Sequence, residues 1–254
     1  MQISSALITG GTSGIGHALA GSLRARGVDV MTTGRRALSE ANAASTHVAG
    51  DITDPAHRAH LAARLAELRA PRALFHGAGA FQTGRLHTLT SKDWQRSFDI
   101  NVTARWELSR LAAPLLAGGR ILFIGSDAGR NPRNGAAAYS VAQSASETLR
   151  MCLQVELAET DIAVTGFKPG LVDTPMVRGF LEASDNAFPA RRDYLTYIDN
   201  GKLTAPATVA RFASWLLCNV ETARFRATGW DVRDPDHHDE WLQGPLFLPA
   251  TKRA

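Results

Sequence analysis

The chain has 254 residues, of which 44% are hydrophobic and 20% are charged. This composition supplies a sizeable buried core and excludes an intrinsically disordered protein. The formal net charge is +4, but the basic residues are scattered among acidic ones rather than gathered in a stripe. A nucleic-acid partner is therefore not expected, whereas an anionic small molecule is compatible with the charge.

Cysteine usage and the N-terminal residues bear on the compartment. Cys152 and Cys218 lie 66 residues apart without metal-ligand spacing, so both are expected to be reduced core residues. The first residues lead into an apolar strand with no basic stretch and no long apolar segment. A cytoplasmic protein without a membrane partner is predicted.

Apolar runs of strand length alternate with helical patterns along the chain. Strands are expected over residues 6–9, 28–33, 73–76, 120–125, 162–167 and 227–232. One helix is expected from Gly14 to a stop at Gly27, and another after an N-cap at Asp54 with Pro55 in its first turn. Further helices are expected over 91–116, 137–158 and 206–218. This alternation predicts an α/β fold with one parallel sheet, helices on both its faces, and a single domain over residues 1–254.

Residues 176–203 interrupt the alternation. They carry aromatic and apolar side chains among charges, with no clean period. A long irregular insertion within a compact domain is usually functional, so this segment is predicted to be a lid over the substrate. The alternative is a pair of amphipathic helices packed on the surface.

A glycine-rich turn joins the first expected strand to the first helix. The residues are Thr9-Gly10-Gly11-Thr12-Ser13-Gly14-Ile15-Gly16. Glycines let the backbone approach a pyrophosphate, and the helix N-terminus offers free N–H groups and a positive dipole end. A Walker loop is excluded because His17 stands where that loop requires lysine.

The Thr-Gly-x3-Gly-x-Gly spacing resembles that of the short-chain dehydrogenase/reductase family. Further motifs resemble the family's segments: Asp51 after Gly50, Gly77-Ala78-Gly79, Asn101, Ser126 placed 13 residues before Tyr139, and Pro169-Gly170 followed by Thr174. The resemblance covers almost the whole chain. It implies a doubly wound, Rossmann-like sheet that binds a nicotinamide dinucleotide.

The resemblance and the turn together assign the cofactor-binding positions. They are Gly10, Thr12, Ser13, Gly14, Ile15, Gly16, Arg35, Arg36, Asp51, Ile52, Ala78, Gly79, Gln143, Pro169, Gly170, Val172 and Thr174. The second strand ends in Arg35 and Arg36 with no acid for ribose hydroxyls, and a guanidinium binds phosphate bidentately. NADP(H) is therefore predicted. The alternative is a solvated pair of surface arginines.

The catalytic residues are predicted from the resemblance to be Ser126, Tyr139, Asn101 and Gln143. It implies that tyrosine exchanges a proton with the substrate oxygen, that serine holds this oxygen, and that asparagine holds a relay water. A lysine normally lowers the tyrosine pKa and anchors the ribose, but Gln143 stands in its place. A cation about 6 Å away at an effective dielectric near 20 is worth about two pKa units.

Loss of that charge favours one direction of reaction. Alcohol oxidation needs tyrosinate as a base, whereas carbonyl reduction needs neutral tyrosine as an acid, so reduction should suffer less. Lys168, just before Pro169, is a candidate replacement for the charge. The alternative is that Lys168 points to solvent.

Two other groups of polar residues are further candidates. Asp127 and Arg130 either shape the substrate mouth or pair with each other. His237-His238 is expected to be a polar loop rather than a metal site.

These observations predict an NADP(H)-dependent oxidoreductase that reduces a ketone or aldehyde of a small molecule, with Tyr139 as proton donor. Two alternatives remain: a non-redox dehydratase, isomerase or cyclase using Ser126 and Tyr139, and a non-catalytic nucleotide-binding protein. The expected partners are a small carbonyl or alcohol substrate and further copies of the chain. A homodimer or homotetramer would form through the helices of 94–116 and 137–158, along an apolar stripe or ordinary core face that includes Val141 and Leu149.

Overall fold

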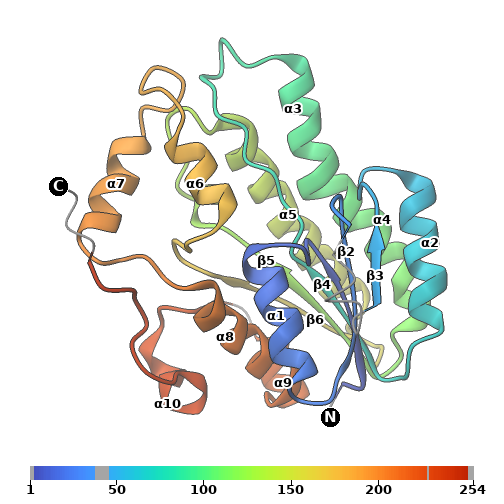
Figure 1. Ribbon diagram of the computed structural model, residues 1–254. Coiled ribbons are helices and arrows are strands. Elements are labelled where there is room, and N and C mark those ends of the chain that lie inside the picture. The colour runs from blue at the N-terminus through green and yellow to red at the C-terminus, as the bar shows by residue number, and fades with distance from the viewer. Residues whose placement is uncertain (1–2, 38–45, 228, 251–254) are drawn as a thin grey trace.

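The computed structural model describes residues 3–37, 46–227 and 229–250 (Figure 1). Predicted features that fall on residues 1–2, 38–45, 228 and 251–254 lie outside the described residues. Within them, seven parallel strands form one sheet. The strands are β1 Ser5–Thr9, β2 Asp29–Gly34, β3 Thr46–Ala49, β4 Arg72–His76, β5 Arg120–Ile124, β6 Ala163–Lys168 and β7 Trp230–Asp231.

The strand order is β3-β2-β1-β4-β5-β6-β7, so the chain reverses its direction of winding between β1 and β4. In open parallel sheets, ligands bind at the carboxyl ends of the strands next to such a reversal. The helices are α1 Gly14–Arg24, α2 Pro55–Ala66, α3 Ser91–Phe98, α4 Ala104–Ala112, α5 Ala137–Glu156, α6 Pro175–Leu181, α7 Arg191–Asp199, α8 Pro206–Cys218, α9 Thr222–Phe225 and α10 His238–Trp241. The predicted α/β fold is confirmed.

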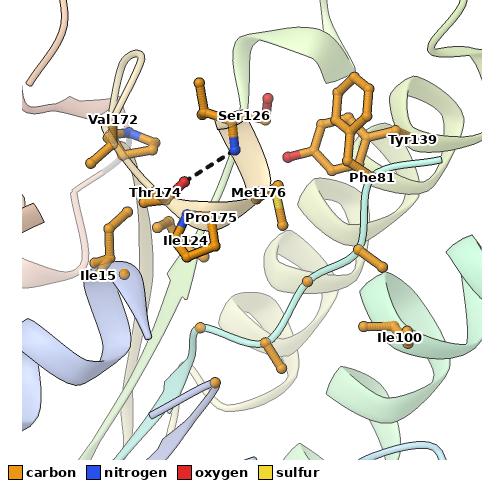
Figure 2. Close-up of a pocket in the computed structure, with 18 of the residues that line it drawn as sticks. Ile15, Phe81, Ile100, Ile124, Ser126, Tyr139, Val172, Thr174, Pro175 and Met176 are labelled. Atoms are coloured by element: carbon orange, nitrogen blue, oxygen red, sulfur yellow. Dashed lines mark hydrogen bonds between the residues drawn. The ribbon is translucent and has the colours of Figure 1, made fainter. Parts of the chain in front are cut away.

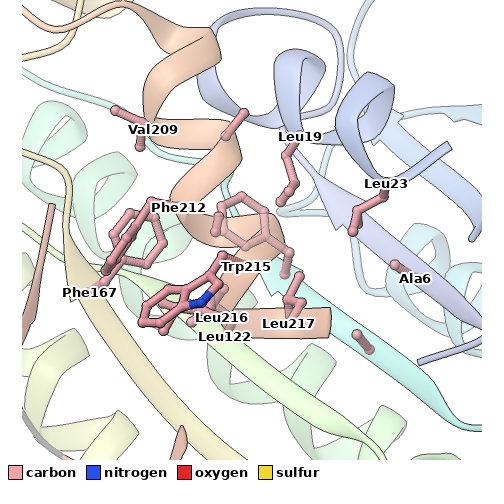
Figure 3. Packing of buried hydrophobic residues seen from close by; sticks show 14 of the residues in the cluster. Ala6, Leu19, Leu23, Leu122, Phe167, Val209, Phe212, Trp215, Leu216 and Leu217 are labelled. Carbon is pink, nitrogen blue, oxygen red and sulfur yellow. The ribbon is translucent and has the colours of Figure 1, made fainter. Parts of the chain in front are cut away.

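Two apolar cores cover the two faces of the sheet. On one face, α1 and α8 pack together, and one apolar cluster holds Leu19 and Leu23 of α1 with Phe212, Trp215 and Leu216 of α8 (Figure 3). On the other face, α2, α4 and α5 cover a second cluster that includes Leu61, Leu108 and Ile121 (Figure 1). Burial on both sides explains why the inner strands are continuously apolar rather than alternating.

Local signals place the helix ends. The Asp54 carboxylate accepts a hydrogen bond from the Ala56 amide, and Pro55 occupies the first helical position, so α2 begins as predicted. Helix α8 matches the predicted 206–218 at both ends. Gly27 closes the turn after α1 with φ of +78°, a conformation that glycine adopts without strain.

The elements differ from the predictions at four points. The pattern missed β3, which is short and only partly buried. The helix expected over 91–116 is interrupted by a π-helical turn, Asp99–Thr103, between α3 and α4. The segment 176–203 contains most of α6 and all of α7, which matches the alternative of two helices rather than an irregular insertion. The last expected strand is shorter, with only Trp230–Asp231 paired to β6.

The π-helical turn has a local cause. The Asn101 side-chain amide donates to the Ser97 carbonyl at 2.9 Å, the group that the Asn101 backbone amide would use in an α-helix. A side chain that competes for a backbone acceptor in this way disturbs the helical ladder.

No helix among the described residues is long and apolar enough to span a membrane.

Candidate active site

A cavity of about 880 Å³ opens at the carboxyl ends of the inner strands. Its walls come from the glycine turn after β1, the ends of β2, β4 and β5, the start of α5, and the connection from β6 into α6. Segments far apart in sequence therefore face one space, at the reversal between β1 and β4. Most of the predicted site residues line this cavity. Arg36 and Asn101 do not line it, but they hydrogen-bond backbone groups of the segments that do.

The turn after β1 has the shape of an anion cradle. Gly10 has φ of +71°, and a Cβ there would lie 2.8 Å from the Gly77 carbonyl oxygen. A Cβ at Gly16 would lie 2.5 Å from the Gly10 carbonyl oxygen, so neither position accepts a side chain. Ser13 is the N-cap of α1 but makes no side-chain capping hydrogen bond. The first N–H groups of α1 are thus available to a phosphate, and the residues fit a dinucleotide.

The two arginines after β2 differ. Arg36 donates to the Thr12 carbonyl at 3.3 Å and so braces the glycine turn. Arg35 is exposed and lines the cavity. On the other side, an Asp51 oxygen accepts hydrogen bonds from the Thr53 amide and hydroxyl, both at 2.9 Å, and these bonds lower the pKa of Asp51. Arg35 and Asp51 therefore both line the cavity, next to the ends of β2 and β3.

Asn101 fixes the loop that follows β4. Its side-chain oxygen accepts from the Ala80 amide at 3.2 Å, and its side-chain amide donates to the Ala80 carbonyl at 2.9 Å. The side chain is fully buried. This pairing holds the loop that contains Ala78 and Gly79 against the π-helical turn. These contacts are those of a positioning residue.

Tyr139, Ser126 and Gln143 meet at the middle of the cavity. The Tyr139 ring packs against Phe81, with centroids 4.6 Å apart, and its hydroxyl lies on the side toward the β5 end (Figure 2). Burial raises the pKa of Tyr139, opposed by the hydrogen bond with Ser126 and by the charge of Arg105. Ser126 also accepts from the Ala128 amide at 3.2 Å. Gln143, one helical turn after Tyr139 on α5, is buried and lines the same cavity.

Arg105 is a cavity residue that the sequence reading missed. It lies on α4, one turn after Asn101, and is 4% exposed. Its guanidinium donates to the Ile124 carbonyl at 3.0 Å, the Ser146 hydroxyl at 2.9 Å and the Ala78 carbonyl at 3.3 Å. Burial lowers its pKa to about 10, with an opposing contribution from Tyr139, so it is cationic at neutral pH. The i, i+4 spacing from Asn101 was the available signal.

The segment from Pro169 to Thr174 leads from β6 into α6. Gly170 has φ of +70°, and the Thr174 hydroxyl accepts from the Val177 amide as the N-cap of α6. A Cβ on Gly14 would lie 3.1 Å from the Thr174 methyl group, so this segment crosses close to the start of α1. Pro169, Val172 and Thr174 line the cavity, as predicted.

Lys168 forms an ion pair and does not line the cavity. Its ammonium lies 3.5 Å from an Asp127 oxygen, and Arg233 also binds Asp127, at 2.8 Å. Arg233 in turn pairs with Asp231 at 2.6 Å. Asp127 therefore pairs with these two cations and not with Arg130. The charge of Lys168 is therefore balanced by Asp127 within this cluster of two cations and two carboxylates.

An aromatic group closes the end of the cavity next to Tyr139. Phe81 contacts Phe180 and Phe188 with centroid distances of 4.6 and 5.4 Å, and Phe180 contacts Tyr194 at 4.9 Å. Phe180 and Tyr194 belong to α6 and α7. These two helices lie together beyond the ends of the strands (Figure 1). Phe81 carried no periodic signal in the sequence, since it lies in a loop.

The remaining polar candidates lie elsewhere. His237 is buried and stacks on the Trp215 ring at 5.6 Å, and His238 hydrogen-bonds the Val232 carbonyl at 2.9 Å. In the described parts of the chain, no three His, Cys, Asp or Glu side chains form a group that could hold a metal ion. Cys152 is exposed rather than a core residue, because it faces outward on α5.

Comparison with known proteins agrees with this geometry. The profile of the short chain dehydrogenase family matches residues 4–185. The 2,3-dihydro-2,3-dihydroxybenzoate dehydrogenase of Escherichia coli strain K12 is 31% identical over 222 residues, covering 84% of this chain and 89% of that protein. The 3-oxoacyl acyl-carrier-protein reductase of the same strain is 28% identical over 221 residues, covering 83% and 88%.

A solved structure shows the same fold. The short chain dehydrogenase from Burkholderia cenocepacia J2315, in complex with NADP, superposes with a TM-score of 0.74 at 27% identity. The alignment covers 89% of this chain and 94% of that one. The chain therefore belongs to the short-chain dehydrogenase family of nicotinamide-dependent oxidoreductases.

Proposed function

We propose that the protein is an NADP(H)-dependent reductase of a ketone or aldehyde on a small organic molecule. The observation that carries this proposal is Tyr139, which lies in the cavity next to Ser126 and whose pKa is raised by burial. A phenol with a raised pKa is protonated at neutral pH and is therefore an acid, not a base. Reduction needs that acid.

The chain's own residues divide the work in this proposal. Gly10, Ser13 and the first turn of α1 bind the pyrophosphate, Arg35 binds the 2′-phosphate, and Gln143 bonds the nicotinamide ribose through its amide. The bound cofactor supplies the hydride. Ser126 donates a hydrogen bond to the substrate carbonyl, and Tyr139 gives its proton to that oxygen. Phe81 and Phe180 exclude water on the far side.

Two further features support parts of the proposal. Met176, Phe180, Tyr194 and Tyr197 line the cavity, which supports a lid role for 176–203. The exposed apolar side chains of α4 and α5 support assembly through these helices. They are Trp106, Val141, Met151 and Val155. A cytoplasmic protein remains part of the proposal.

Cofactor titration tests it. NADPH and NADH are titrated separately, with the fluorescence of the five tryptophans as readout, for the wild type, Arg35→Ala and Arg64→Ala. Arg64 is a matched control because it is a half-buried arginine on α2 that lies outside the cavity and pairs with Glu67. Arg35→Ala is expected to weaken NADPH binding about tenfold to a hundredfold and to leave NADH unchanged, since a hydrogen bond to a charged group is worth about 1.5–3 kcal/mol.

Other outcomes point elsewhere. Absence of binding by either cofactor would contradict the reductase and direct attention to cofactor-free acid–base chemistry at Tyr139. Equal binding of NADPH and NADH, unchanged in Arg35→Ala, would contradict the choice of NADP. After tight NADPH binding, oxidation of NADPH by a panel of ketones and aldehydes identifies the substrate class.

A further inference from the structure

In the described part of the chain, four arginine side chains are buried, and they differ in what neutralises them: Arg58, Arg105, Arg120 and Arg150. Arg58 binds Glu107, and Arg150 binds Glu147 at 2.8 Å. Arg120 lies at the opposite end of β5 from the cavity. Arg105 alone of the four lines the cavity.

No carboxylate among the described residues pairs with Arg105. Its partners are two carbonyl oxygens and one hydroxyl, and its Nε is buried without a partner. An unpaired buried cation is costly, and a fold that served only stability would replace it with an apolar side chain. Its retention at the cavity points to a charge that serves the site.

The bonding partners place this charge next to the proton donor. Ser146 is on α5, one turn after Gln143 and two turns after Tyr139, on the helix face that lines the cavity. Ile124 ends β5 just before Ser126, and Ala78 belongs to the loop on the other wall. The guanidinium is thus held between the three segments that carry or adjoin Tyr139, Ser126 and the predicted cofactor loop.

The charge of Arg105 acts on His76, at the end of β4, and on Tyr139, on α5. His76 is buried and hydrogen-bonds Ser109 at 2.8 Å, and burial holds its pKa well below the usual range, so it stays neutral. Tyr139 is therefore the group on which the charge acts when a proton is transferred.

We propose that Arg105 supplies the positive charge that stabilises the Tyr139 phenolate, from α4, in place of a lysine at position 143. This inference rests on the proposed reductase and says how its proton-transfer step is completed. Hydride adds to the carbonyl carbon, the Tyr139 O–H bond breaks, and the proton goes to the carbonyl oxygen. The phenolate left at Tyr139 is held by the Arg105 charge until water returns a proton. Arg105 is a positioning residue, since it acts through Tyr139.

The test measures the phenol directly. A fluorinated tyrosine, which is more acidic than tyrosine, is incorporated at position 139, and its ¹⁹F resonance is titrated in protein without substrate or cofactor. Arg105→Gln, which keeps a hydrogen-bonding amide but no charge, is expected to raise the midpoint by about one to two pH units. Arg105→Lys, which keeps the charge, is the matched control and is expected to stay near the wild-type midpoint.

A charge relocation is the second arm. Arg105→Gln combined with Gln143→Lys returns a cation to the α5 face, one turn from Tyr139, and is expected to bring the midpoint back toward that of the wild type. A folded Arg105→Gln variant with an unchanged midpoint would overturn the proposal and leave Arg105 a purely structural role. If Arg105→Gln does not fold, Ser146→Asp replaces it, because a carboxylate beside the guanidinium cancels its charge. An unchanged midpoint in Ser146→Asp would equally overturn the proposal.

The readout separates this inference from the proposed function. A midpoint that moves as expected in a protein that never oxidises NADPH would support Arg105 and contradict the reductase. A protein that reduces carbonyls with NADPH, but whose Tyr139 midpoint is the same in all the Arg105 variants, would support the reductase and contradict the role of Arg105.

Discussion

Two buried arginines at opposite ends of β5 show how the two edges of the sheet differ. Arg120 begins the strand, donates to the Leu216 and Val220 carbonyls at 2.5 and 2.6 Å, and lies over the Phe225 ring at 4.6 Å. Arg105 bonds the carbonyl of Ile124, where the strand ends. Arg120 closes the end of α8 and does not line the cavity that holds Tyr139, whereas Arg105 does.

The difference teaches that the same buried side chain has different uses at the two edges. At the amino edge, the guanidinium satisfies carbonyls that the end of a helix leaves free, which stabilises the fold. At the carboxyl edge, loops diverge from the strands and leave polar groups facing a shared space. Variants at the carboxyl edge should therefore change the activity but not the free energy of unfolding. Variants at the amino edge should change the free energy of unfolding but not the activity.

The largest expected effect is at the carboxyl edge. Tyr139→Phe removes the proton donor but keeps the ring that packs on Phe81. Carbonyl reduction is expected to fall about 100- to 10,000-fold, with the melting temperature nearly unchanged. Steady-state NADPH oxidation and thermal unfolding measure the two quantities. Retention of most of the reductase activity would show that another group donates the proton.

At the amino edge, Arg120→Met is expected to reverse this pattern. It removes the donors for Leu216 and Val220 and leaves these carbonyls buried without partners. The free energy of unfolding should fall by about 2–4 kcal/mol, as measured in urea, while NADPH binding stays the same. A variant as stable as the wild type would mean that the carbonyls find other donors, and the contrast between the edges would then be weaker than we infer.

The smallest expected effect sharpens the comparison, because His76 lies at the carboxyl edge but is buried. Its folded pKa is well below 6.5, whereas the unfolded chain binds a proton there near that value. Between these two pKa values only the unfolded state is protonated, so the free energy of unfolding decreases as the pH falls below about 6.5, by up to about 1.4 kcal/mol per pH unit. His57, whose pKa burial also lowers, acts in the same direction.

Urea unfolding of the wild type and His76→Asn at several pH values between 5 and 8 measures this slope. The variant should show a shallower dependence, leaving the part due to His57. Identical slopes in the two proteins would show that His76 does not carry the effect.

Much of the site was predictable because its signals are local. The glycine turn needs backbone conformations and close approaches that only glycine permits, as Gly10 and Gly16 show, and these positions are visible in the sequence. The start of α2 was predictable for a similar reason, because Asp54 is a typical N-cap residue and Pro55 is favoured at the first helical position. Tyr139, Ser126 and Gln143 were predicted from the resemblance to the family, and the structure brings all three to one cavity.

The alternation of strands and helices, the parallel sheet, the glycine turn and the likeness to the family could all be predicted from residue types at short fixed spacings. The position of the cations relative to Tyr139 could not, because it depends on how distant segments pack. Lys168 is adjacent to the cofactor segment in sequence, yet Asp127 holds it at the mouth. Arg105 reaches the centre because α4 packs beside α5 and the end of β5, a long-range contact that no local pattern encodes.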